Sequence, residues 1–204
     1  LLYLSMAATG ASVPVVTVAG PEAAIVAALA ANVAAVAAED GRSTLVVDTD
    51  LGRAAPSVAV GAGLRAGLTD VLRAGRPIGE AIVAVPVGRD VTLDVLPAGV
   101  APPPPLASDA AAVEESLARL ARRYDLTVVA VPPFDAEQRE APRLLVGADV
   151  IVCATAGQTP LTGLAREIAR LNASGARVRG LVLWDGDVPA IPTRTELRDG
   201  AAAA

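Results

Sequence analysis

Lysine and histidine are both absent from this chain, because all 17 basic residues are arginine. With no histidine and a single cysteine, Cys153, the chain has neither the usual zinc ligands nor a histidine for acid–base catalysis. The lone Cys153 cannot form a disulfide within the chain. Its setting beside the apolar residues 150–152 predicts that it packs as a small hydrophobic side chain.

Positive charge and long apolar runs are also scarce. The net charge is −5 and the arginines are scattered, so no basic stripe is present that would neutralise a nucleic-acid backbone. No apolar run reaches the ~18 residues of a membrane span, since even the alanine-rich stretch at 23–38 contains Asn32 and is followed by Glu39 and Asp40. We therefore expect no nucleic-acid partner, and contact with a membrane only through a partner or a parent chain.

What the chain does contain is aliphatic. Of its 204 residues 53% are apolar but only 2% are aromatic, which indicates one α/β domain with a core of Ala, Val and Leu. Strands and helices alternate along it. The predicted strands are 13–18, 43–50, 91–97, 126–131, 149–155 and 179–183, the predicted helices are 23–38, 69–75, 78–83, 108–123 and 160–174, and residues 51–67 are predicted to be loop.

The domain is predicted to span residues 13–190. The chain begins with Leu1 rather than Met, and its first residues lack the basic start of a signal peptide. We therefore expect residues 1–12 to be an N-terminal extension, or the boundary of a fragment of a larger parent chain. Residues 191–204, which end in four alanines, are predicted to be a C-terminal tail.

The first strand, Gly20-Pro21 and the following helix form the strand–loop–helix frame of a phosphate-binding loop. Such a loop needs a Lys to reach the β- and γ-phosphates and a Ser or Thr hydroxyl for Mg²⁺. After the turn the chain reads Ala23-Ala24-Ile25-Val26-Ala27-Ala28, which offers neither. The frame is present, but the groups that bind phosphate are missing.

Asp48 and Asp50 lie at the carboxyl end of the second predicted strand, where open α/β sheets place their ligand sites. Two carboxylates there have two interpretations: they hold Mg²⁺, or they cap the turn that follows. Without phosphate ligands nearby, the cap is the favoured interpretation. If the chain binds a metal at all, these two residues are the expected ligands.

Several phrases together resemble one family. They are LVVDTDLGR at 45–53, GLTDVLRAG at 67–75, LDVLPAGVAPPPP at 93–105, RYDLTVVAVPP at 123–133 and ADVIVCATAGQT at 148–159. In this order they resemble the cytoplasmic kinase domain of bacterial tyrosine kinases of the polysaccharide co-polymerase type, relatives of the MinD and ParA ATPases. The resemblance implies a doubly wound, mostly parallel sheet flanked by helices. It also implies ATP- and Mg²⁺-dependent tyrosine phosphorylation in capsule or exopolysaccharide export.

Carried over by position, the resemblance implies a degenerate site. The register of Ala30–Ala34 on the family's AANLA phrase places the phosphate-loop lysine at Val26 and the hydroxyl residues at Ala27 and Ala28. The aspartate of the third acidic motif becomes Ala130, and Trp184 stands where the family often has an asparagine beside the base. The predicted vestigial pocket therefore consists of Gly20, Val26, Ala27, Ala28, Asp48, Asp50, Ala130 and Trp184.

These losses favour a catalytically inactive, pseudokinase-like domain, because each group that stabilises a transferring phosphoryl is worth about 3 kcal/mol or more and at least three are missing. We expect no cofactor and a role in protein–protein contact, with a membrane co-polymerase or an active kinase of the same assembly as partner. The expected location is the cytoplasmic face of the cell membrane. Two alternatives remain: an ATP-binding kinase or ATPase completed by another subunit, and a ParA- or MinD-like positioning factor.

Overall fold

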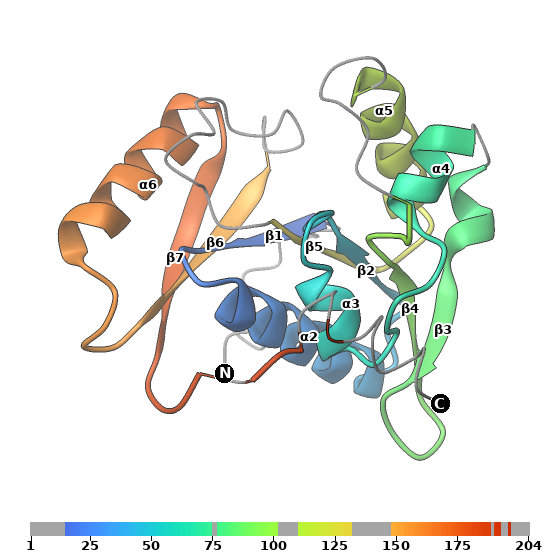
Figure 1. Ribbon diagram of the computed structural model, residues 1–204, viewed down its shortest axis with the longest axis horizontal. Coiled ribbons are helices and arrows are strands. Elements are labelled where there is room, and N and C mark those ends of the chain that lie inside the picture. Colours follow the sequence, from blue (N-terminus) through green and yellow to red (C-terminus); the bar gives the residue numbers. More distant parts are fainter. Residues whose placement is uncertain are drawn as a thin grey trace.

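A seven-stranded sheet forms the centre of the computed structural model, which describes residues 15–74, 77–101, 110–131, 148–188, 190–192 and 196 (Figure 1). The strands lie in the order β3-β4-β2-β5-β1-β6-β7. All are parallel except β3, which pairs antiparallel to β4. Their bounds are Val15–Ala19 (β1), Thr44–Asp48 (β2), Val83–Pro86 (β3), Thr92–Leu96 (β4), Leu126–Ala130 (β5), Asp149–Thr155 (β6) and Arg177–Trp184 (β7).

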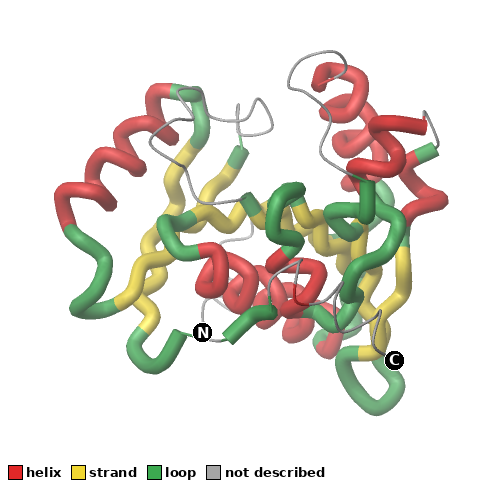
Figure 2. Tube along the Cα trace, viewed as in Figure 1, coloured by secondary structure: helices red, strands yellow, loops and turns green. Residues whose placement is uncertain are grey.

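Helices cover both faces of the sheet, as Figures 1 and 2 show. Helices α2 and α3 pack on one face, and α4, α5 and α6 pack on the other. Their bounds are Ala23–Glu39 (α2), Ala55–Ala59 (α3), Leu68–Ala74 (α4), Ala110–Ala121 (α5) and Leu161–Ala173 (α6), with a short 3-10 helix, η1, at Ile78–Ala81. The predicted doubly wound, mostly parallel α/β fold is therefore confirmed.

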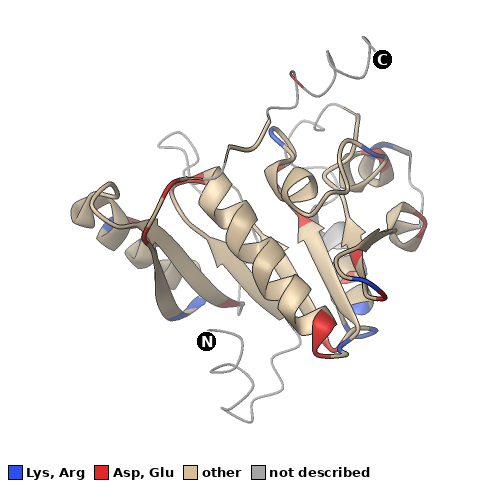
Figure 3. Cartoon of the chain, turned by 90° about the horizontal axis from the view of Figure 1, so that it is seen from below, with Lys and Arg blue, Asp and Glu red and all other residues tan. Residues whose placement is uncertain are grey.

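Helix α2 forms most of one layer. Ten of its 17 residues are buried, and its small side chains let the helix lie close to the sheet. Seen from that side, α2 carries no charged residue before Glu39 (Figure 3). Within the described part of the chain, no helix is both long and apolar enough to span a membrane.

Two sequence predictions need correction. Residues 51–67 were predicted to be loop, but Ala55–Ala59 form helix α3, whose first turn contains Pro56 and whose length is too short to give a helical period. The predicted helix at 78–83 ends at Ala81, and Val83 begins strand β3. That short edge strand is stabilised by antiparallel pairing with β4, a contact between separate segments that the local pattern did not reveal.

Two of the phrases that carry the family resemblance contact each other directly. The backbone N–H groups of Leu68 and Thr69, at the start of α4, donate to the carbonyls of Pro97 and Ala98. Asp70 accepts from the N–H groups of Gly67, Val100 and Ala101, at 2.9, 2.9 and 3.2 Å. These charge-assisted bonds lower the pKa of Asp70 despite an opposing effect of burial. The start of α4 is thereby bound to the loop that follows β4.

Gly67 is required at this contact by close packing. A Cβ at this position would lie 2.6 Å from the carbonyl carbon of Pro97, which is backbone and cannot turn away. We therefore expect Gly67→Ala to lower the free energy of unfolding by about 2 kcal/mol, measured by urea denaturation. Gly79→Ala is the matched control, because no atom lies within 4 Å of its Cβ position, and it should change stability by less than about 0.5 kcal/mol. Equal effects of the two variants would contradict this account.

Candidate functional site: the carboxyl edge of the sheet

The sequence-predicted site residues lie near the carboxyl ends of the parallel strands, but they do not form one pocket. Asp48 ends β2 and pairs in register with Ala130 at the end of β5, which in turn lies beside Val18 of β1. Gly20 follows β1 directly. Trp184 ends β7, which is separated from β2 by three strands.

The connection between β1 and α2 is the part that a phosphate-binding site would need most. It consists of three residues only, Gly20, Pro21 and Glu22, and the helix begins at Ala23. A phosphate-loop motif is about eight residues long, and its Gly-rich part stays non-helical because its backbone N–H groups must surround the phosphates. A connection of three residues is too short to form that cradle.

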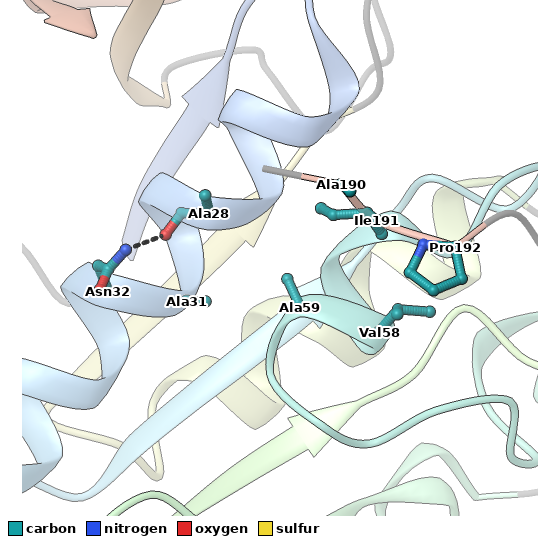
Figure 4. Close-up of a pocket in the computed structure, with 8 residues that line it drawn as sticks. All are labelled: Ala28, Ala31, Asn32, Val58, Ala59, Ala190, Ile191 and Pro192. Atoms are coloured by element: carbon teal, nitrogen blue, oxygen red, sulfur yellow. Dashed lines mark hydrogen bonds between the residues drawn. The ribbon is translucent and has the colours of Figure 1, made fainter. Parts of the chain in front are cut away.

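The three positions that the family register assigns to the lysine and the hydroxyls therefore lie inside the helix. Val26 is only 2% exposed and belongs to the main core between α2 and the sheet. Ala27 is fully buried. Ala28 instead lies beside α3, where it lines a groove on the outer side of α2 (Figure 4). Val26 and Ala28 therefore lie in different environments: Val26 in the main core and Ala28 at the groove beside α3.

The groove in Figure 4 has a volume of about 380 Å³ and lies between α2, α3 and residues 190–192. Its lining is Ala28, Ala31, Asn32, Val58, Ala59, Ala190, Ile191 and Pro192. The polar side chain among these, Asn32, donates to the carbonyl of Ala28 at 2.8 Å. No charged side chain lines the groove, so it offers no site for a phosphate.

Gly20 is explained by packing rather than by ligand binding. A Cβ on Gly20 would lie 2.6 Å from both the carbonyl oxygen and the Sγ of Cys153 on β6. Cys153 is 1% exposed and belongs to the main core, as the sequence predicted. Its burial, with smaller effects from the charges of Glu167 and Glu22, raises the pKa of the thiol to about 12. Cys153 therefore stays protonated and unreactive at neutral pH.

Glu22 occupies the end of α2 and was not identified from the sequence. Its backbone carbonyl accepts the N–H groups of Ile25 and Val26, both at 3.1 Å. Its carboxylate accepts hydrogen bonds from the hydroxyls of Thr159, at 2.9 Å, and of Thr155. Glu22 is the N-cap residue, so its negative charge lies near the helix N-terminus, where nucleotide-binding folds keep an anionic phosphate, although its carboxylate makes no hydrogen bond to the first-turn N–H groups. A second anion there would be repelled.

Asp48 uses its carboxylate to join segments of its own chain. One oxygen accepts the N–H of Asp50 at 2.8 Å, and the other accepts the N–H and the hydroxyl of Ser57 at 2.9 and 2.5 Å. Ser57 also accepts the N–H of Ala98 at 3.1 Å, which connects β2 and α3 to the loop after β4. These bonds are the ones that the interpretation of Asp48 as a turn cap requires. Ser57, its main partner, was not found from the sequence because it lies in the segment predicted to be loop.

Asp50 also caps the turn, but less completely. One carboxylate oxygen accepts the N–H of Arg53 at 3.3 Å, while the other has no hydrogen-bond partner among the described residues. Burial raises the pKa of Asp50, and its bonds and charge interaction with Arg53 partly offset this. Mg²⁺ prefers near-octahedral oxygen ligands. One buried oxygen of Asp50 beside an Asp48 already bonded by three donors does not fit that requirement, and the described residues contain no group of three His, Cys, Asp or Glu side chains that could hold a metal ion.

Ala130 and Trp184 are the last two residues of the predicted vestigial pocket. Ala130 is fully buried, and its carbonyl accepts the N–H and the hydroxyl of Thr49 at 3.1 and 2.8 Å. An aspartate here would place a second carboxylate beside Asp48 in the core. Trp184 is half-buried against the main core, and its indole N–H donates to the carbonyl of Asp187 at 3.2 Å. It therefore fixes the turn after β7.

Comparison of the chain with models of protein families and with curated proteins gives no match. Solved structures do match. The kinase domain of Escherichia coli tyrosine kinase ETK aligns with a TM-score of 0.71 and 20% identity, over 93% of this chain and 75% of that one. The VpsO kinase domain aligns with a TM-score of 0.65 and 26% identity, over 85% of each chain.

MinD proteins are also among the structural neighbours. The septum site-determining protein MinD of Pyrococcus horikoshii OT3, solved with Mg-ADP, aligns with a TM-score of 0.66 and 22% identity, over 83% of this chain and 69% of that one. The structural neighbours thus are bacterial tyrosine kinase domains and MinD ATPases, and the predicted resemblance is confirmed at the level of the fold.

The buried position of Val26 gives a direct test. We expect that Val26→Lys, which would restore the family's lysine by register, instead lowers the free energy of unfolding by several kcal/mol, because it puts an unpaired charge into an apolar core. Val36→Lys on the same helix is the control, since Val36 is 46% exposed and the ammonium can reach water. Thermal and urea denaturation measure both. A stable Val26→Lys protein that gains ATP binding would contradict this arrangement.

Asp48 makes stability depend on pH near neutrality. Burial, opposed by its hydrogen bonds, raises the pKa of Asp48 from 3.8 to about 7. Between these values the folded protein keeps a proton that the unfolded chain has released, so the free energy of unfolding falls as pH rises through this range, by at most about 4 kcal/mol. Burial raises the pKa of Asp50 and Glu167 as well, which adds to the same trend.

Two variants separate Asp48 from the other groups. Asp48→Asn should flatten the pH dependence of urea denaturation between about pH 4 and 7, and should cost about 1–3 kcal/mol at pH 5 because its amide N–H₂ faces a backbone donor. Asp125→Asn should keep the slope, because Asp125 is exposed and its hydrogen bonds with Ser43 lower its pKa. An unchanged slope in Asp48→Asn would show that Asp48 does not titrate in this range.

Proposed function

We propose that this chain is a catalytically silent relative of the bacterial tyrosine kinase domains of polysaccharide export, and that it acts through protein–protein contacts in such an assembly. The observation that carries the proposal is the connection between β1 and α2. Three residues replace a phosphate loop, and the third, Glu22, places a carboxylate at the helix end. A polyanion such as ATP would meet a closed and negatively charged surface there.

The other half of the nucleotide site supports the same conclusion. Asp48 would have to release Ser57 and Asp50 before it bound a metal, and this would break the contact between the end of β2 and α3. Position 130 supplies a methyl group where the resembling kinases have an acidic group. Since phosphoryl transfer depends on positioning and on charge, loss of both leaves no basis for catalysis.

The nature of the partner rests on the resemblance. Several structural neighbours are tyrosine kinase domains, including that of BceF, with a TM-score of 0.66 and 21% identity over 92% of this chain and 74% of that one. A membrane co-polymerase or an active kinase of the same system is the proposed partner. A domain that keeps this fold without a nucleotide site would use the surfaces that an active kinase presents to its assembly.

One observation favours the alternative of an enzyme completed by another subunit. The second carboxylate oxygen of Asp50 is buried without a partner among the described residues, and a metal brought by another chain would satisfy it. A subunit in trans would still have to supply the phosphate cradle at Gly20–Glu22. Because Val26 is buried inside the core, this alternative has the weaker support.

Calorimetric titration with ATP and with ADP, each with Mg²⁺, tests the proposal. We expect no binding heat and no thermal shift up to millimolar nucleotide, because no cradle surrounds the phosphates. MinD of Pyrococcus horikoshii, which was solved with Mg-ADP, serves as the positive control. Micromolar binding, or tyrosine phosphorylation above background, would overturn the proposal. A pull-down with the membrane co-polymerase tests the interaction role separately from the absence of nucleotide binding.

A further inference from the structure

Strand β7 is the outermost strand on the α6 side of the sheet (Figures 1 and 2). It is eight residues long and pairs with β6 along one edge, while its other edge has no strand partner in the described part of the chain. Natural proteins usually protect such an edge with charges, proline or a covering element. Here the second half of the strand carries two exposed leucines instead, Leu181 at 50% and Leu183 at 62% exposure.

Both leucines extend the apolar face under α6 beyond the helix that covers it. Leu181 and Leu183 lie in register with Val152 and Ala154 of β6. Those two residues are buried in the cluster that Leu164 and Leu171 of α6 cover. The apolar surface therefore continues from β6 onto β7, but the described residues leave its β7 part uncovered.

Charge is distributed unevenly along the same strand. At its start, Arg177 and Arg179 both bind the carboxylate of Asp149, at 2.7 and 2.9 Å, so that two positive charges share one negative charge. At its other end, Asp185 and Asp187 are exposed, and no ion pair of theirs is found among the described residues. The order along the chain is thus positive, apolar, negative. Such a strand is complementary to a second copy of itself running in the opposite direction.

We propose that β7 pairs antiparallel with β7 of a second copy of this chain, about a twofold axis beside Val182. This register places Leu181 opposite Leu183 of the second copy, and Arg179 opposite its Asp185. The irregularity in the β6–β7 pairing lies between Val150 and Ile151, where Arg179 of β7 has no register partner on β6, so Arg179 and Asp185 flank the regular segment 180–184. The two sheets then form one continuous sheet, and each exposed leucine gains a leucine of the second copy as its cross-strand neighbour.

The expected strength follows from the size of the contact. A strand of eight residues is ~26 Å long, and a pairing confined to one such edge buries less than ~1,200 Å², the range of weak and transient interfaces. The dissociation constant should therefore be micromolar. The dimer needs no nucleotide and does not depend on the proposed loss of kinase activity, so the two proposals can fail separately.

Sedimentation equilibrium of the full chain tests the dimer across the micromolar range. We expect a monomer–dimer equilibrium that Leu183→Lys weakens at least tenfold, with an unchanged thermal melting curve because the side chain is mostly exposed. Val36→Lys is the matched control, since it adds the same charge at an exposed apolar residue of α2, on a helix remote from the β7 edge. A monomer at all concentrations, or a dimer lost in Val36→Lys but kept in Leu183→Lys, would overturn the proposal.

Charge exchange tests the register. Arg179→Asp and Asp185→Arg should each prevent dimerisation, because like charges then face each other twice across the axis, while Arg177 still pairs with Asp149. A mixture of the two variants should dimerise again as a heterodimer, because both facing pairs become opposite in sign. Recovery in the mixture supports the antiparallel β7 pairing. A mixture that stays monomeric while each variant remains folded by circular dichroism rules out this register.

Discussion

The hydrogen bonds of one buried carboxylate hold the carboxyl edge of this sheet together. Asp48 receives three donors, from the turn after β2 and from α3, and Ser57 passes the connection to Ala98 in the loop after β4. That loop is in turn bound to the start of α4. A carboxyl group that is fully buried needs such hydrogen-bond partners to offset its lost hydration. The segments that resemble a kinase are thus connected through a structural role for Asp48.

The proposal of a domain without a nucleotide site rests on the same edge of the sheet. In a phosphate loop, the helix N-terminus and the backbone before it face an anion. Here the helix starts within three residues of the strand, and Glu22 supplies the negative charge from within the chain. Gly20 lies against Cys153, and small residues bring α2 close to the sheet. Close packing has replaced the space that a ligand would fill.

With the interior of the edge closed, the surfaces that remain for recognition are external. The open edge of β7 combines apolar exposure in its second half with opposite charges at its two ends. Helix α2 presents a second, uncharged surface on the other side of the sheet. Both surfaces depend on main-chain arrangement and on small or aliphatic side chains. They suit a domain whose role is contact with other proteins.

The sequence by itself determined the fold class and most of the strands and helices, because apolar runs such as residues 126–130 and the alanine-rich α2 specify buried elements locally. It also determined what the site lacks, since no lysine exists to be supplied. Only the tertiary structure decided what Asp48, Glu22 and Ser57 do. Their partners lie up to 137 residues away along the chain, and strand β3 likewise exists through pairing with another segment. Contacts between residues far apart in the sequence leave no local pattern in it. They could therefore be identified only in the folded structure.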